Sequence, residues 1–205
     1  MSYTLYSSPG SCSMAVHVAL EECNVPYTYK KTVIANGDTR TPEYLKLNPR
    51  GQVPVLVHPT GDVQLEGAAQ MAYILDTYGD GSLLPQGGLP RAQALQWLMF
   101  ANATLHPAYS RWFWAKKNGW AEVETAAASS IQTLWQQVEE QLTAHGPYLC
   151  GANPTIGDVV VTVIANWSNT FQFGPHTTAL LKAIRARPAF ERCREQEGVS
   201  YQVAA

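Results

Sequence analysis

The chain has 205 residues, of which 46% are hydrophobic and 15% are charged, and its formal charge at pH 7 is -2. This composition can build an apolar core and excludes wholesale disorder, and the near balance of charge gives no source for electrostatic capture of a nucleic acid or an anionic membrane. No stretch approaches the roughly 20 apolar residues of a membrane-spanning helix, and the N-terminal MSYTLYSSPG lacks the regions of an export signal. We therefore expect a cytoplasmic protein, and its length favours two domains.

The first part of the chain, residues 1–79, alternates short β-like runs with helix-like ones. The order is β-α-β, then a polar stretch with a short helix, then β-β-α. A cluster of turn formers at 59–62 predicts a hairpin between the last two strands. The predicted strands are 3–7, 27–33, 55–58 and 63–65, and the predicted helices are 12–22, 42–47 and 67–78.

The second part, residues 88–205, has helical periodicity almost throughout and predicts an all-helical domain. Asp80-Gly81 and the Pro/Gly-rich segment 84–90 make a natural linker, because such residues rarely continue a helix. Thr155 and Asp158 have the spacing of a capping box before an apolar run. The predicted helices are 91–109, 122–144, one that begins after Pro154, 178–186 and 188–197.

Cys12 follows a strand and a Pro-Gly turn and begins a helix, where exposed N–H groups and the helix dipole favour an anion. Such placement can lower the pKa of a cysteine from about 8.5 into the range of about 3.5 to 7.5, so a nucleophilic thiolate is predicted. The alternative is a small buried residue that happens to begin a helix. Cys23, Cys150 and Cys193 do not share this position and are interpreted as core or surface residues. No CxxC pair or histidine ligand spacing predicts a metal site.

Two further segments have features of a binding site. Val53-Pro54 precedes a β-run, and a cis bond there would let Val53 offer its N–H and C=O to an extended peptide, although sequence alone favours trans. Glu66-Gly67 begins a helix whose free N–H groups can hold a carboxylate while Glu66 meets an ammonium group. The alternative for Glu66 is ordinary compensation of the helix dipole.

Together these segments resemble a glutathione transferase, and within that superfamily the bacterial beta class. The resemblance implies an N-terminal thioredoxin-like domain and a helical C-terminal domain, and it covers nearly the whole chain. The motifs that carry it are Ser8-Pro9-Gly10-Ser11-Cys12-Ser13, Tyr44-Leu45-x-x-Asn48-Pro49-x-Gly51-x-Val53-Pro54, Leu65-Glu66-Gly67, Gln96-Trp97-Leu98 with His106, and Pro147-Tyr148-Leu149 leading to Thr155-x-x-Asp158.

The resemblance implies a role for each of these residues. Cys12 would face the glutathione sulfur, Pro54 would be cis, and Val53 would pair with the cysteinyl backbone. His106 would reach toward the cysteine, where it can hold a proton or stabilise a thiolate; a histidine bonded for structure is the alternative. The implied glutathione-binding residues are Ser11, Cys12, Gln52, Val53, Pro54, Glu66 and Gly67.

Several positions depart from the family pattern. Gly67 replaces a frequent Ser or Thr, Pro107 replaces a frequent basic residue, and Met99 and Ala103 stand where relatives often present polar groups. Fewer polar contacts predict weaker glutathione binding. Ser11 beside Cys12 also leaves a serine route to thiol activation open.

Aromatic residues follow His106 closely and are more numerous than one helix face would bury. Tyr109, Trp112, Phe113 and Trp114 are candidates to line a site for an apolar second substrate. Packing of the helical core and a dimer interface are equal alternatives, and Trp167 is assigned to the core.

We therefore expect a homodimeric glutathione transferase that conjugates glutathione to small apolar electrophiles or exchanges thiols and disulfides through Cys12, as in detoxification. A cysteine can form a mixed disulfide with glutathione, which favours redox turnover. The rival hypothesis is a ligand-binding or regulatory protein with little catalysis. Retention of Cys12, Val53-Pro54, Glu66 and His106 argues against the rival, because a scaffold needs only the fold.

Overall fold

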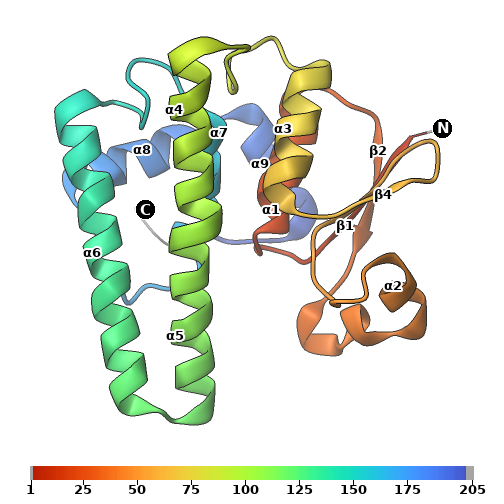
Figure 1. Ribbon diagram of the computed structural model, residues 1–205, viewed down its shortest axis with the longest axis horizontal. Helices are drawn as coiled ribbons and strands as arrows, with labels where there is room; N and C mark the ends of the chain where they lie inside the picture. Colours follow the sequence, from red (N-terminus) through yellow and green to blue (C-terminus); the bar gives the residue numbers. More distant parts are fainter. Residues whose placement is uncertain (1, 202–205) are drawn as a thin grey trace. The chain divides into compact units, whose positions relative to one another are not determined.

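The computed structural model describes residues 2–201, which divide into two compact units. Unit 1 comprises residues 2–84 together with 186–201, and unit 2 comprises residues 85–185. Figure 1 traces the chain through both. Among the helices of the described chain, none combines the length and apolar character that crossing a bilayer requires.

Unit 1 is built on a mixed four-stranded sheet with the order β2-β1-β3-β4. The central strand β1 (Tyr3–Ser7) pairs in parallel with β2 (Tyr27–Lys31) and antiparallel with β3 (Val55–Val57), and β3 pairs antiparallel with β4 (Val63–Gln64). The parallel pair requires a crossover, which the helix between β1 and β2 supplies. The predicted β-α-β and β-β-α order is therefore confirmed, with strand ends that differ by a residue or two.

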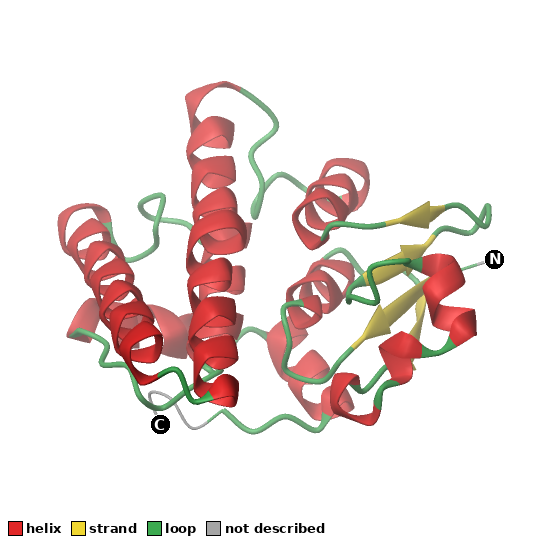
Figure 2. Cartoon of the chain, turned by 60° about the horizontal axis from the view of Figure 1, so that its bottom comes forward, coloured by secondary structure: helices red, strands yellow, loops and turns green. Residues whose placement is uncertain are grey.

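Alternate side chains of β1 point to opposite faces of the sheet, and each face has its own helices. The Tyr3 hydroxyl is hydrogen-bonded to Tyr73 and Tyr78 of α3 (Gly67–Tyr78), which packs against α1 (Ser13–Glu22). The Tyr6 ring instead packs edge-on against Tyr44 of α2 (Pro42–Leu47), with ring centroids 5.8 Å apart. Figure 2 shows helices on both faces of the sheet. Two 3-10 turns, η1 (Ile34–Asn36) and η2 (Asp38–Arg40), precede α2.

The last helix, α9 (Pro188–Glu197), belongs to unit 1, which differs from the prediction that residues 88–205 form one helical domain. Arg187 at its start makes a bidentate pair with Glu22 of α1, with N–O distances of 2.6 and 2.8 Å. Glu197 at its end lies 2.9 Å from His17 of α1. Long-range pairs such as these, together with Arg192–Glu21, join α9 to unit 1.

Unit 2 is helical, as predicted, but its first long helix differs from the prediction. The predicted helix 91–109 is the middle of a longer run made of α4 (Gly88–Met99), a π-helical segment η3 (Phe100–Leu105) and α5 (His106–Asn118). A π segment shifts the helical register, so one apolar stripe cannot be followed across it. The other helices are α6 (Ala121–His145), α7 (Ile156–Ala165) and α8 (Pro175–Arg185).

Helix α7 is the centre of unit 2, because all ten of its residues are buried. The predicted capping box at its start is confirmed. Asp158 accepts hydrogen bonds from the backbone N–H of Thr155 at 2.6 Å and of Leu149 at 2.9 Å. Gly157 allows α4 to approach closely, since a Cβ at this position would lie 2.8 Å from Cβ of Trp97. One carboxylate thereby joins the N-cap residue of a buried helix to the loop before it.

Helix α8 begins on a carboxylate from α6. Glu139 accepts hydrogen bonds from the N–H groups of His176 and Thr177 at 3.1 and 2.7 Å, and from the Thr177 hydroxyl at 2.7 Å. Burial by itself raises the pKa of Glu139, but these donors outweigh it and lower the pKa to about 2. The folded state therefore holds Glu139 ionised more firmly than the unfolded chain does.

Replacing Glu139 with Gln is expected to lower the free energy of unfolding by about 1–3 kcal/mol at neutral pH, because one acceptor oxygen becomes a donor that faces N–H groups. The folded pKa is depressed, so the contribution of the carboxylate is present above its unfolded pKa of about 4.3 and is lost as the pH falls toward about 2. Urea unfolding of both proteins between about pH 7 and about pH 3 measures this difference. A difference that stays constant across the series would contradict the assignment.

Candidate functional site

Cys12 occupies the strand-turn-helix position that the sequence predicts. It is the N-cap residue of α1, follows Gly10 with a φ of +68°, and has no side-chain cap on its helix. Its Sγ lies 3.7 Å from the carbonyl oxygen of Val53, which brings together two segments that are far apart in the sequence. The Cys12 helix start and the Val53-Pro54 segment therefore share one site in unit 1.

The structure opposes the prediction of a strongly lowered cysteine pKa. Burial, which removes water from the thiolate, raises the pKa of Cys12 to about 11. The N–H groups of Cys12 and Ser13 and the hydroxyl of Ser11 lower it by smaller amounts, and the carboxylate of Glu66 raises it. The helix start acts in the predicted direction, but desolvation is the larger effect. The thiol is thus protonated at neutral pH and needs a proton acceptor.

The Val53-Pro54 bond is cis, as the family resemblance implies. The carbonyl of the preceding residue, Gln52, accepts hydrogen bonds from the Tyr44 hydroxyl and the Asn48 side-chain amide, both at 2.8 Å. Among the described residues, no hydrogen bond occupies the backbone N–H of Val53. The backbone at Gln52 is therefore held firmly, while the N–H of Val53 is available to an extended ligand. The carbonyl of Val53, which accepts only from the Cys12 thiol among the described residues, is available as well.

The Glu66-Gly67 segment, at the start of α3, lies next to Pro54. A Cβ on Gly67 would lie 3.2 Å from Cγ of Pro54, which gives a physical reason for the small residue found here. Glu66 has a φ of +68°, which is rare for a residue with a side chain, and no side-chain cap covers the N–H groups of α3. The predicted helix-start site is therefore open and adjacent to Pro54.

Two polar residues that the sequence interpretation did not select complete this site. Arg50 forms an exposed ion pair with Glu66 at 2.8 Å. Gln70, fully buried in α3, donates to the carbonyls of Gln64 at 2.6 Å and Pro54 at 3.5 Å and so ties the two segments together. The signal for Gln70 was an amide on an otherwise apolar helix face; Arg50 had none, because an arginine in a loop is usually solvated.

His106 lies in unit 2 as the first residue of α5. Its ring packs edge-on against Trp167, with centroids 4.9 Å apart, and makes no hydrogen bond to any residue of the described chain. Burial lowers the pKa of His106, which favours the neutral ring at pH 7. A neutral imidazole has a free lone pair, so the ring can accept a proton.

The structure separates the aromatic candidates of unit 2. Tyr109 and Trp112 are buried, and the Tyr109 hydroxyl accepts a hydrogen bond from Nε1 of Trp135 at 2.9 Å. Both rings pack against Phe171, which favours core packing, one of the alternatives, over the proposed second-substrate role. Phe113 is exposed and stays a candidate.

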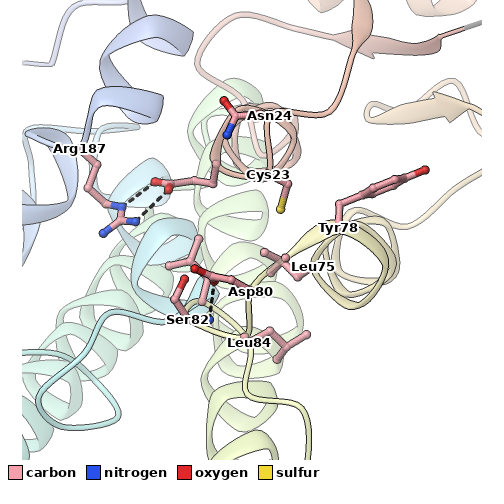
Figure 3. A pocket seen from close by; sticks show the side chains of 12 residues that line it. Cys23, Asn24, Leu75, Tyr78, Asp80, Ser82, Leu84 and Arg187 are labelled. Carbon is pink, nitrogen blue, oxygen red and sulfur yellow. Dashed lines mark hydrogen bonds and ion pairs between the residues drawn. The ribbon is translucent and has the colours of Figure 1, made fainter.

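Pockets elsewhere in the molecule do not contain the predicted site residues. One of about 340 Å³ lies in unit 1, where α1 ends and segment 79–84 begins, and Figure 3 shows Cys23, Asp80 and the Arg187 ion pair around it. Another lies on unit 2 between α5 and α6 and includes Arg111. Within residues 2–201, no group of His, Cys, Asp and Glu side chains could hold a metal ion.

Alkylation of Cys12 is expected to be slow at neutral pH, because a thiol with a pKa of about 11 is only about one part in 10⁴ thiolate at pH 7. The rate with iodoacetamide, followed at Cys12 by peptide mass spectrometry, should rise with pH without levelling off below about pH 10. Cys12→Ser identifies the signal of this residue among the four cysteines. A plateau near neutral pH would show that the helix start outweighs desolvation.

Comparison with known proteins points to a family. Residues 10–77 match the model of the glutathione S-transferase N-terminal domain. Glutathione S-transferase GST-4.5 of Xanthomonas campestris is 31% identical over 80% of this chain and 82% of that protein. Glutathione S-transferase GstA of Escherichia coli O157:H7 is 27% identical over 95% of this chain and 98% of that protein.

A solved structure agrees with these sequence matches. The glutathione S-transferase of a sphingomonad, complexed with glutathione, superposes with a TM-score of 0.82 at 27% identity and covers 96% of this chain and 100% of that one. Its likeness extends over both units, whereas the family model covers only the first. With the Cys12, Val53-Pro54 and Glu66-Gly67 segments assembled as described, this chain belongs to the glutathione S-transferase family.

Proposed function

We propose that this glutathione transferase binds glutathione on unit 1 and carries out thiol–disulfide exchange through Cys12, besides conjugating glutathione to apolar electrophiles. The observation that carries this proposal is the convergence of three segments. The Cys12 thiol lies 3.7 Å from the Val53 carbonyl, and the start of α3 lies against Pro54. Each supplies a group that a tripeptide with a thiol and a free α-amino acid end requires.

Glutathione fits these groups in an extended conformation. The free N–H and the carbonyl of Val53 would pair with the cysteinyl backbone, as an added strand does. The uncapped N–H groups at the start of α3 would hold the γ-glutamyl carboxylate, and Glu66 would meet its ammonium group. Arg50 now pairs with Glu66, so the ammonium must share or displace this cation. Gly67 offers backbone N–H groups but no hydroxyl, which supports weak binding.

The exchange reaction proceeds in two balanced steps. The Cys12 thiolate attacks the glutathione sulfur of a mixed disulfide, which forms a Cys12–glutathione disulfide and releases the other thiolate. A second glutathione thiolate then attacks this disulfide, and oxidised glutathione leaves with Cys12 restored. Because burial raises the pKa of Cys12 to about 11, the first step needs a base. We assign this task to the neutral ring of His106.

Conjugation makes a smaller demand on Cys12. The enzyme need only stabilise the glutathione thiolate while it attacks the electrophile, and Ser11, the helix N–H groups or His106 can do this. The exposed Phe113 is proposed to contact an apolar electrophile. The rival hypothesis of a non-catalytic ligand-binding protein is not favoured, because the relatives and the superposed structure are glutathione transferases.

The finer assignments belong to the same proposal. Cys12, His106 and the motifs around Val53-Pro54 support a beta-class enzyme, and bacterial relatives support a bacterial protein. A homodimer, a cytoplasmic location and a role in detoxification are proposed from the family resemblance.

Replacing Cys12 with Ala is expected to keep glutathione affinity within about tenfold, because binding relies on backbone groups of Val53 and the α3 start. Reduction of a glutathione mixed disulfide should be abolished, and conjugation to an aromatic halide should fall only modestly. Calorimetric titration at millimolar glutathione and the two activity assays measure this separation. Cys23→Ala is the matched control, since that thiol lies outside the site. No glutathione binding by the folded wild-type protein, or wild-type disulfide reduction by Cys12→Ala, would refute the proposal.

Replacing His106 with Ala is expected to leave the unfolding temperature nearly unchanged, because its ring makes no hydrogen bond within the described chain. Disulfide reduction should slow by about 10²-fold or more, in the range typical of general acid–base catalysis. Its pH profile should lose the dependence on a group that titrates below about pH 6.5. His145→Ala, at an exposed position of unit 2, is the control. Loss of several kcal/mol of stability with unchanged turnover would instead support a structural role.

A further inference from the structure

The C-terminal helix of unit 1 ends on a buried carboxylate that the reaction described above does not use. The Glu197 side chain has no solvent exposure and lies in the last turn of α9, where the helix dipole disfavours a negative charge. Three donors compensate it. The Gly10 N–H donates at 2.8 Å, the Ser7 hydroxyl donates at 3.3 Å, and Nδ1 of His17 lies at 2.9 Å. A carboxylate is tolerated in such a place only when donors surround it.

Two of these donors lie just before Cys12, Ser7 at the end of β1 and Gly10 in the loop that follows. Gly10 lies two residues before Cys12 and has a φ of +68°, a conformation that favours glycine. Ser7 ends β1, so Glu197 fixes both the end of the strand and the middle of the loop.

A serine of α1 extends the same network to the residue beside Cys12. Oγ of Ser13 is 2.8 Å from Oγ of Ser7 and 2.7 Å from Oγ of Ser11, and it accepts a hydrogen bond from the Ser8 N–H at 3.0 Å. Ser7 and Ser13 are fully buried. The hydrogen-bonded chain therefore runs from Glu197 through Ser7 and Ser13 to Ser11, whose hydroxyl acts on the Cys12 thiol.

The thiol depends on the geometry that this network holds. The groups that favour its thiolate are the N–H groups of Cys12 and Ser13 and the Ser11 hydroxyl, and all three belong to the loop or to the first turn of α1. The Cys12 side chain does not cap α1, but the Ser11 hydroxyl accepts a hydrogen bond from the Ser13 N–H at 3.3 Å, so the network reaches the first turn of the helix. A displacement of about 1 Å in such a group can cost about 10²-fold in rate.

We infer that Glu197 is a positioning residue, which through Gly10, Ser7 and Ser13 holds the donors of the Cys12 loop in line with the thiol. It touches neither Cys12 nor a substrate, and it acts by fixing the backbone. The part of this inference that concerns turnover rests on the proposed function; the part that concerns thiol reactivity does not.

Glu197→Gln is the test, because the amide has nearly the same shape but can no longer accept from both Gly10 and Ser7. Two control variants accompany it. Arg187→Ala removes the bidentate pair with Glu22 and loosens α9 at its other end, away from the loop. Glu195→Gln changes an exposed carboxylate of the same helix. The measurements are the unfolding temperature, alkylation of Cys12 by iodoacetamide at about pH 9, and disulfide reduction with glutathione.

Glu197→Gln is expected to slow Cys12 alkylation by about fivefold or more and to lower kcat for disulfide reduction by about tenfold or more, with KM for glutathione within about threefold. Arg187→Ala should lower the unfolding temperature with both rates of the folded protein unchanged, and Glu195→Gln should change nothing. If the thiol responds and turnover is absent in all proteins, the proposed function fails while the positioning role stands.

If the rate of Cys12 alkylation in Glu197→Gln stays within about twofold of the wild-type rate, the inference is overturned and Glu197 has a structural role only. A faster rate of Cys12 alkylation in this variant would also overturn the inference. It would mean that Glu197 keeps the thiol shielded instead of aligning the donors that favour its thiolate. If Glu197→Gln does not fold, Ser13→Ala carries the test, since it breaks the network between Ser7 and Ser11 and leaves Glu197 with its three donors. Slower alkylation at Cys12 is again the expected result, and an unchanged rate would again refute it.

Discussion

A buried carboxylate must be surrounded by donors, and in unit 1 this requirement joins the two ends of the described chain. Glu197 on α9 is satisfied only if His17, Ser7 and Gly10 lie where they do. The C-terminal helix is therefore part of the unit that carries Cys12, although more than a hundred residues of unit 2 separate them in the sequence. The strand end, the loop and the first turn of α1 are all placed by that one side chain and its neighbours.

The second constraint is the arrangement of helix N-termini around Val53-Pro54. In unit 1, the N-cap residue Thr41 caps α2 with its hydroxyl, whereas the N-cap residues of α1 and α3 make no such hydrogen bond. An uncapped start is not distinctive by itself, because α9 has none either. What distinguishes α1 and α3 is that both begin next to the Val53-Pro54 segment. The Cys12 thiol at the start of α1 contacts the Val53 carbonyl, and Gly67 at the start of α3 lies against Pro54. The start of α3 thus lies beside Pro54 with its first N–H groups uncapped, whereas at the start of α1 the N–H groups of Ser13, Met14 and Ala15 already donate to Ser11 and Cys12.

Competition between desolvation and hydrogen bonding decides the state of Cys12. The helix start stabilises a thiolate, but burial destabilises it more, and the thiol keeps its proton. Burial also lowers the pKa of His106 in unit 2, which favours its neutral ring. In each unit, burial therefore favours the uncharged form of the group.

The sequence by itself determined the elements and brought out most of the segments that meet at the candidate site. Short alternating runs, turn formers and the Thr155–Asp158 spacing are local signals, so the strand order along the chain and the capping box of α7 could be predicted. Cys12, Val53-Pro54 and Glu66-Gly67 were visible because each combines a residue type with a local position. The tertiary structure decided whatever depends on distant partners. It placed α9 in unit 1 through Glu22 and His17, and it buried Tyr109 and Trp112 against Phe171. It also raised the pKa of Cys12, because desolvation is set by every atom packed around a group and not by the helix on which the group stands.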